Sequence, residues 1–157
     1  MKKLFMILLL AMPFAAMSQT QSGYTANYSS NFKMSDAKYS DEILMLWKDF
    51  ENNTLDKDIG MFADTVTMVM AQGTPVKGLK DNLAGAKAFR SSVTNYKVSV
   101  DAWMSLKSID RDQNWVAVWG TENYTDKDGK AITQRIHEIW GFNKDGKVSI
   151  MMQYLGM

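Results

Sequence analysis

The 157-residue sequence contains no cysteine, one histidine and two prolines. Without cysteine the chain can form no disulfide, no zinc–thiolate site and no thiol nucleophile, and it cannot carry the lipid anchor of a lipoprotein. A single histidine argues against a metal centre, because such centres need several clustered ligands. Motifs for a serine nucleophile, a phosphate-binding loop or a dinucleotide site are also absent from the sequence. We therefore expect neither a metal nor a cofactor.

The sequence also lacks an excess of either charge. It has 18 Lys and Arg residues against 17 Asp and Glu residues, and no basic cluster stands out along the chain. Nucleic-acid binding needs a basic face that neutralises phosphates. The composition therefore speaks against a nucleic-acid partner.

Long hydrophobic runs are missing too, because the apolar run at residues 4–14 is well short of the roughly 20 residues that span a membrane. A basic start precedes this run and small residues follow it, an order typical of a secretory signal peptide. We interpret residues 1–18 as a signal peptide, 19–34 as a flexible polar leader and 35–157 as one domain. The mature protein would be periplasmic or secreted, without a membrane span; an uncleaved anchor is the alternative.

Hydrophobic spacing divides the domain into helices followed by strands. Residues 36 or 41 to 51, 55–62 and 79–91 show helical spacing, and a strand is expected at 66–71. In the first helix Ile43, Leu46, Trp47 and Phe50 fall on one face, which is expected to be buried. From residue 96 onward the pattern alternates, which predicts four long strands at 96–108, 115–125, 131–142 and 148–155. The Asp-Gly pairs at 128–129 and 145–146 predict tight hairpins, so the last three strands form an antiparallel meander in an α+β chain.

Several phrases, in this order, resemble a known superfamily. They are LWKDFENNTLDKDIGMFADTVTMV, then GTPVKG, then Trp140-Gly141-Phe142 before Asp145-Gly146-Lys147-Val148. They are similar to nuclear-transport-factor-2-like domains, the superfamily of SnoaL-like polyketide cyclases and ketosteroid isomerases, here of an exported bacterial type. The resemblance implies a cone-shaped roll in which a curved antiparallel sheet packs on three N-terminal helices around a pocket. Function varies widely across this family, so the fold alone indicates little about activity.

The hairpins allow a prediction of the strand register. If each Asp-Gly pair forms a two-residue loop, Trp119 lies opposite Glu138 and Glu138 lies opposite Gln153. The resemblance to ketosteroid isomerases places an inward acid at Glu138, so the face that carries Glu138 is expected to line the pocket. The expected ligand-binding residues are Trp47, Met70, Trp119, Thr121, Asn123, Gln134, Trp140, Met151 and Gln153.

Glu138 is the candidate catalytic residue. Burial in an apolar bowl would raise the pKa of its carboxyl, as a general acid or base requires. The plainer interpretation is a structural carboxylate satisfied by Gln153 and the indole of Trp119. The isomerase reaction is disfavoured, because Met70 and Leu46 stand where the resemblance implies an aspartate base and a tyrosine donor.

Two functions remain open at this point. The first is a binding or accessory module for a small apolar or amphipathic molecule. The second is a cofactor-free acid/base enzyme of the isomerase, cyclase or hydrolase type that uses Glu138. A single carboxylate without a partner base favours the first.

The face opposite the pocket is expected to form a homodimer. Monomeric proteins rarely expose a large apolar patch, and a two-fold pairing is the commonest way to cover one. Alternatively, the leader folds back over this face through Tyr24, Tyr28 and Phe32. The polar residues predicted on this face are Glu122, Arg135 and His137. The apolar ones are Val116, Val118, Ile139, Ile150, Met152 and Tyr154.

Signal-peptide cleavage can be tested on the exported protein. We expect the mature chain to begin at Gln19, because Ala16 and Ser18 provide the small residues that precede a cleavage site. Intact-mass measurement of protein recovered outside the cytoplasm checks this. A mass that still includes residues 1–18 contradicts cleavage there.

Overall fold

The structure is a computed structural model that describes residues 23–156; the expected signal peptide at 1–18 lies outside these residues. The helices are α1 (Lys38–Glu51), the short 3-10 helix η1 (Leu55–Met61) and α2 (Leu79–Ser92). The strands are β1 (Phe32–Met34), β2 (Phe62–Val69), β3 (Val76–Lys77), β4 (Thr94–Ser108), β5 (Gln113–Thr125), β6 (Ala131–Phe142) and β7 (Val148–Gly156). None of the helices in this part of the chain is long and apolar enough to cross a membrane.

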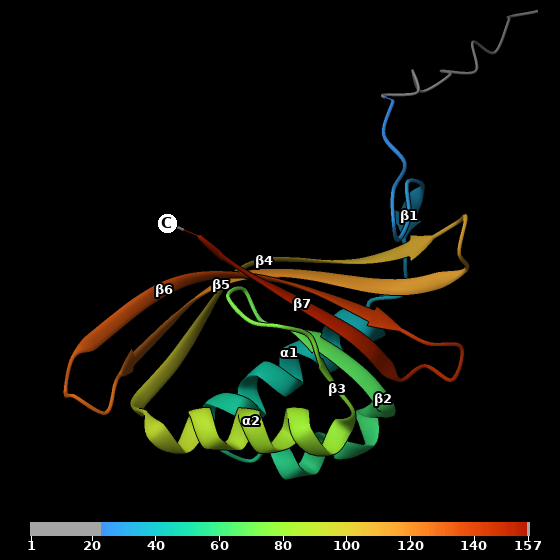
Figure 1. The fold of residues 1–157 in the computed structure, drawn as a ribbon. Helices are drawn as coiled ribbons and strands as arrows, with labels where there is room; N and C mark the ends of the chain where they lie inside the picture. The colour runs from blue at the N-terminus through green and yellow to red at the C-terminus, as the bar shows by residue number, and fades with distance from the viewer. Residues whose placement is uncertain (1–22, 157) are drawn as a thin grey trace, which may run out of the picture.

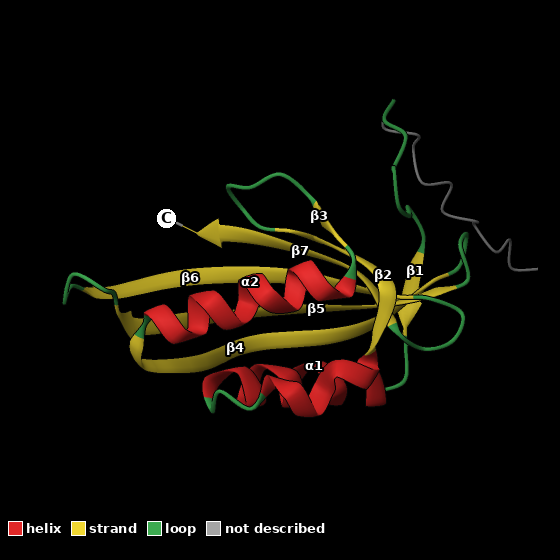
Figure 2. Ribbon diagram, turned by 60° about the horizontal axis from the view of Figure 1, so that its bottom comes forward, coloured by secondary structure: helices red, strands yellow, loops and turns green. Residues whose placement is uncertain are grey.

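The expected α+β cone is confirmed. Seven strands form one curved sheet in the order β1-β4-β5-β6-β7-β2-β3, and the helices pack on its inner face (Figures 1 and 2). The meander of β4 to β7 is antiparallel, whereas β2 pairs with β7 in parallel, so the whole sheet is mixed. This parallel pair brings the first half of the chain against the last strand.

Helix α1 packs against the sheet, and the hydrophobic core lies between them. Its buried residues include Ile43, Leu46 and Trp47, spaced three and four apart as predicted. They meet a layer of inward side chains from the strands: Val66, Val116, Val118, Ile136, Phe142 and Val148. Together these side chains form this core.

The end of α1 is fixed by charged contacts. Arg90 of α2 donates hydrogen bonds to the carbonyl groups of Phe50 and Glu51, where a helix C-terminus attracts a cation. The buried Glu51 carboxylate accepts hydrogen bonds from Lys48, Lys97 and the backbone N–H of Val98. The hydrogen bond from Lys48 is the main reason that the pKa of Glu51 is lowered to about 2. Both α2 and β4 are thereby tied to the same end of α1.

The hairpin between β5 and β6 corrects the predicted register. Its loop holds three residues, because Asp126 pairs with Lys130 and the Asp126 carboxylate accepts the N–H groups of Asp128 and Lys130. Gly129 adopts a φ of 80°, which favours glycine. The strands are consequently shifted by one residue from the prediction, and Val118 rather than Trp119 lies opposite Glu138.

The shift reverses every side chain of β5. Trp119, Thr121 and Asn123, predicted to face the pocket, lie on the outer face of the sheet. Val116 and Val118, predicted for the outer face, belong to the inner core. The predicted register of β6 and β7 is confirmed, with Glu138 opposite Gln153. That hairpin has the same three-residue loop, but an irregularity between Gly141 and Phe142 compensates for it.

Part of the expected flexible leader has regular structure. Phe32–Met34 forms the edge strand β1 beside β4, and Tyr28 packs edge-on against Trp115 with a ring-centroid distance of 5.7 Å. Ser29 and Ser30 bond to Asp110. The leader therefore covers the end of the outer face that carries Trp115, in line with the alternative in which the leader folds back over this face. Tyr24, which was expected to take part, is 91% exposed.

Gly120 of β5 allows Trp47 to lie close to the sheet. A Cβ at this position would stand 2.4 Å from the Ser99 carbonyl oxygen and 2.8 Å from the Trp47 ring. We expect Gly120→Ala to lower the free energy of unfolding by about 2 kcal/mol, because overpacked cores must shift. Urea unfolding measures this.

Gly85 in α2 provides the matched control. A Cβ there meets nothing within 4 Å. Gly85→Ala should raise stability by up to about 1 kcal/mol, since alanine favours the helix. Equal stabilities of Gly120→Ala and the wild type would show that Trp47 is not packed against β5.

Candidate functional site

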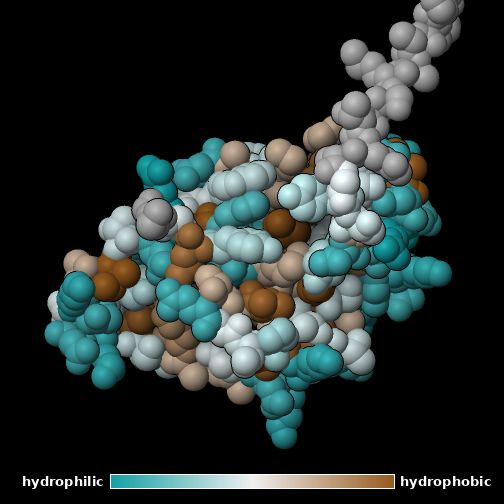
Figure 3. All heavy atoms as spheres, turned by 45° about the horizontal axis from the view of Figure 1, so that its top comes forward, coloured by the Kyte–Doolittle hydropathy of each residue, from teal (hydrophilic) through white to brown (hydrophobic). Residues whose placement is uncertain are grey.

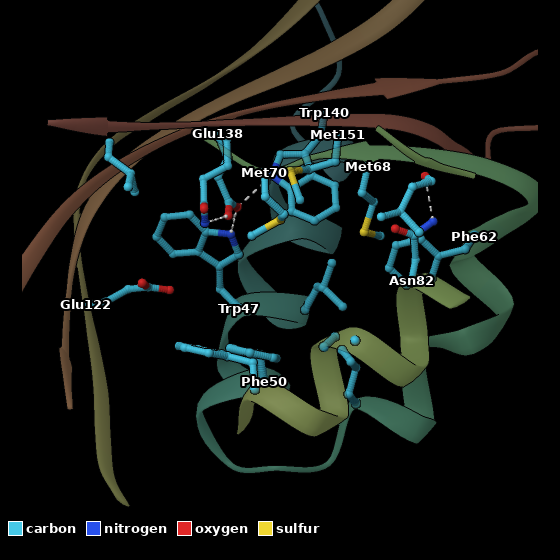
Figure 4. A pocket seen from close by; sticks show the side chains of 18 of the residues that line it. Trp47, Phe50, Phe62, Met68, Met70, Asn82, Glu122, Glu138, Trp140 and Met151 are labelled. Carbon is cyan, nitrogen blue, oxygen red and sulfur yellow. Dashed lines mark hydrogen bonds between the residues drawn. The ribbon is translucent and has the colours of Figure 1, made fainter. Parts of the chain in front are cut away.

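A cavity of about 430 Å³ lies between the inner face of the sheet and the helices (Figure 4). Its walls are mostly apolar and come from α1, β2, α2 and the C-terminal strands. Helix α1 contributes Trp47 and Phe50. Strand β2 contributes Met68, and Met70 follows at the end of that strand. Polar groups gather on the sheet side, where Glu122, Gln134, Glu138 and Gln153 face the cavity.

Glu138 of β6 is the polar centre of this cavity and is only 6% exposed. Its Oε2 accepts the indole N–H of Trp47 at 2.7 Å and that of Trp140 at 3.1 Å. Its Oε1 accepts a hydrogen bond from Nε2 of Gln153 at 3.0 Å. The donors come from α1, β6 and β7, so the carboxylate is held in one orientation by three separate elements.

Two effects of opposite sign act on the pKa of Glu138. Burial, which penalises the charged form, is the largest and raises the pKa, and the nearby charge of Glu122 raises it further. The hydrogen bonds from Gln153, Trp47 and Trp140 lower it. The result is a pKa of about 7, which lets this carboxyl change its charge near neutral pH.

Glu122 of β5 is a second acid in the same cavity. It is 9% exposed and accepts a hydrogen bond from the hydroxyl of Tyr96 on β4. Burial raises its pKa, and the Tyr96 hydrogen bond opposes that rise. In Figure 4 its carboxylate points to the interior, on the side of the Trp47 and Phe50 rings. Its negative charge is one of the causes that raise the pKa of Glu138.

The sequence-based prediction placed Glu122 on the outer face because it assumed the wrong turn between β5 and β6. The two-residue loop assumed for Asp128-Gly129 sent Glu122 outward, whereas Asp126 caps a longer loop. An aspartate three residues before the glycine was the signal in the sequence that could have found it, since Asp side chains bond to the backbone two residues on.

Seven of the ten predicted site residues line the cavity. They are Trp47, Met70, Gln134, Glu138, Trp140, Met151 and Gln153. Trp119, Thr121 and Asn123 do not, and Trp119 instead stacks on His137 at 4.4 Å on the outer face. The plainer interpretation of Glu138 was partly correct: Gln153 does bond to it, but the indole donors are those of Trp47 and Trp140.

The ionisable groups around the cavity are unbalanced. Besides Glu122 and Glu138, the lining includes Asp81 at its exposed rim and Tyr124. None of the described residues that line it is a Lys or an Arg. Within residues 23–156 no group of three His, Asp or Glu side chains is placed to hold a metal ion.

Comparison with known proteins assigns the fold. No family model and no curated protein matches the sequence. A nuclear-transport-factor-2-like protein of unknown function from Burkholderia pseudomallei aligns over 77% of this chain and 92% of its own, with a TM-score of 0.64 and 14% identity. An epoxide hydrolase of M. tuberculosis aligns over 76% and 84%, with a TM-score of 0.62 and 9% identity.

A third solved structure is a putative SnoaL-like polyketide cyclase from Jannaschia. It aligns over 76% of this chain and 86% of its own, with a TM-score of 0.60 and 12% identity. At these identities the similarity establishes the fold and leaves the activity open.

Glu138 should make stability depend on pH. Its pKa rises from 4.5 to about 7 on folding, so the folded state keeps a proton that the unfolded state loses. This contribution is fully present below about pH 4.5 and is lost as the pH rises through 7, by up to about 3 kcal/mol. Urea unfolding between about pH 5 and 8 should therefore show a fall in stability that is smaller in Glu138→Gln.

Glu51→Gln is the control for this measurement. The pKa of Glu51 is lowered, so its contribution is lost only as the pH falls from 4.5 toward 2. That variant should be less stable throughout and keep the wild-type slope above about pH 5. Identical slopes in the wild type and Glu138→Gln would contradict the raised pKa.

Proposed function

For this chain, a nuclear-transport-factor-2-like protein by its fold, we propose the binding of a small, mostly apolar molecule whose polar group bonds to Glu138. The observation that carries the proposal is a buried, oriented carboxylate in the wall of an otherwise apolar cavity. Binding sites for small molecules commonly combine apolar walls with a few placed polar groups. With residues 1–18 as a signal peptide, binding would take place in the periplasm or outside the cell.

The geometry of Glu138 suits an anchor for a ligand. An ionised carboxylate has about four acceptor positions, and the indoles and Gln153 occupy three of them. The open position lies on Oε1, so a hydroxyl or N–H group of a ligand can donate to it. The methionines at 68, 70 and 151 adapt to irregular apolar shapes. The site therefore suits one polar contact and a variable apolar body.

A second candidate function is acid/base catalysis without a cofactor. It is favoured by two buried carboxyls in one cavity, one of them with a pKa near 7, where proton transfer is most effective. Similar folds include an epoxide hydrolase and a putative polyketide cyclase. Turnover of a small apolar epoxide that disappears in Glu138→Gln would favour catalysis, and binding without turnover favours the first function.

We also propose that the outer face pairs two copies of the chain. On this face, beyond the end that Tyr28 covers, Trp119 of β5 stacks on His137 of β6. The His137 ring in turn lies tilted against the ring of Tyr154 of β7. Tyr154 is 50% exposed. Trp119 and His137 are half-buried, so part of this aromatic surface remains accessible to a facing chain. Figure 3, which looks onto the side of the sheet away from the helices, shows hydrophobic side chains among polar ones there.

Filling the cavity tests the binding proposal. Ala86 of α2 lines the cavity, so Ala86→Trp should occupy it and weaken binding of the neutral apolar probe Nile red by roughly tenfold or more. Ala84→Trp, on the exposed side of the same helix, is the matched control and should bind like the wild type. Fluorescence titration measures both. Unchanged affinity in Ala86→Trp would place the probe elsewhere and reject the cavity as the binding site.

Light scattering tests the proposed dimer. Tyr154→Asp places a charge at the centre of the proposed contact, so we expect the wild type to have the mass of a dimer and this variant that of a monomer. Tyr24→Asp, in the exposed leader, is the control and should remain dimeric. A monomeric wild type, or a dimeric Tyr154→Asp, rules out this contact.

A further inference from the structure

We propose that the ligand carries a protonated amine and that this cation binds between Glu138 and Glu122. The inference names the chemical class of the ligand and rests on the function proposed above. It starts from the charges that face the cavity rather than from its apolar walls.

The two carboxyls lack a compensating cation. Neither Lys nor Arg occurs among the described residues that line the cavity, whereas Asp81, Glu122 and Glu138 all do. Arg90 does not line the cavity; its guanidinium carbon lies 5.2 Å from the centroid of the Tyr96 ring. Its guanidinium is already bonded to the carbonyl groups of Phe50, Glu51 and Val93. The positive charge that would balance this pair is thus not provided by the cavity wall.

Both acids keep an oxygen available to a ligand. Among the described residues only Tyr96 donates to Glu122, through Oε1, so Oε2 of this nine-tenths buried side chain is free. On Glu138 only Gln153 donates to Oε1. An ammonium group has three donors and can bond to more than one oxygen. Glu122 lies opposite Gln134, four residues along β6 from Glu138, so the ammonium group would bond to one carboxylate while the charge of the other attracts it.

Charge and aromatic rings both select a cation. Two buried carboxylates repel one another and would repel an anionic ligand more strongly than water-exposed groups would. A cation offsets this repulsion, and a charge-assisted hydrogen bond is stronger than a neutral one. The faces of Trp47 and Phe50 in the wall can add cation–π attraction. Alkylamines are protonated at neutral pH, because their pKa is close to that of lysine at about 10.

Three probes that share one apolar body test the inference. Calorimetric titration compares naphthylethylamine, naphthylethanol and naphthylacetic acid, which are cationic, neutral and anionic at neutral pH. We expect the amine to bind at least about tenfold more tightly than the alcohol and the acid to bind most weakly. Equal affinities of amine and alcohol would overturn the cation proposal and leave the binding function standing. Binding of none of the three would overturn both.

A pair of variants locates the charge that the amine recognises. Glu122→Gln keeps the shape of the side chain and should lower the affinity for the amine about tenfold while leaving that for the alcohol unchanged. Asp101→Asn removes a charge from an exposed position of β4 that does not line the cavity and should change neither affinity, since an exposed charge is screened by water. An unaltered amine affinity in Glu122→Gln would contradict the proposed placement of the cation.

The pH dependence provides an independent readout. The titratable groups that face the two acids are Tyr96 on β4, Glu122 and Tyr124 on β5, Glu138 on β6 and Asp81 on α2. Burial raises the pKa values of the Glu122 and Glu138 carboxyls, which move toward neutral pH. It also raises the pKa values of Tyr96 and Tyr124, so both hydroxyls stay protonated near neutral pH. Affinity for the amine should rise at least about tenfold from about pH 5 to 8, whereas that for the alcohol should not. An amine affinity that is constant over this range would overturn the inference.

Discussion

The carboxylate of Glu138 accepts N–H groups from α1, β6 and β7, and the arrangement of the cavity depends on that junction. Trp47 is at once a core residue of α1 and a donor to Glu138, so the packing of the helix on the sheet also orients the acid. Gly120 leaves the space that the Trp47 ring occupies. Removing one partner would leave buried polar groups without hydrogen bonds, which costs about 1–3 kcal/mol for each group. The stability of the cone and the chemistry of its cavity are therefore linked through one residue.

The turn between β5 and β6 determines which side chains of β5 share the cavity with Glu138. Because Asp126 caps a three-residue loop, β5 is placed so that Glu122 points inward and Trp119 outward. The same shift in register determines which side chains of β5 lie on each face of the sheet. The inner face gains a second acid whose charge acts on Glu138, and the outer face gains Trp119, which stacks on His137. The proposed ligand and the proposed dimer contact are thus two consequences of one loop length.

Local patterns in the sequence were sufficient for most of the fold. Helical spacing identified Ile43, Leu46 and Trp47 as buried, and alternation identified the long strands. Pairings between distant segments could not be derived in this way, because neither the parallel contact of β2 with β7 nor that of β1 with β4 has a local signature. For the site, Glu138 and Gln153 were placed correctly, since a bulge cancelled the error in their hairpin. Glu122 was misplaced because no such bulge occurs in β5 beside β6.

The central claim is that Glu138 is a buried, oriented carboxyl that changes its charge near neutral pH. Carbon-detected NMR of the protein labelled at its glutamate carboxyl carbons follows this group directly, and Glu138→Gln assigns its signal. The account predicts a titration midpoint of about 7. A midpoint near 4.5, the ordinary value for glutamate, would contradict it, because a carboxyl in contact with water would then occupy this position.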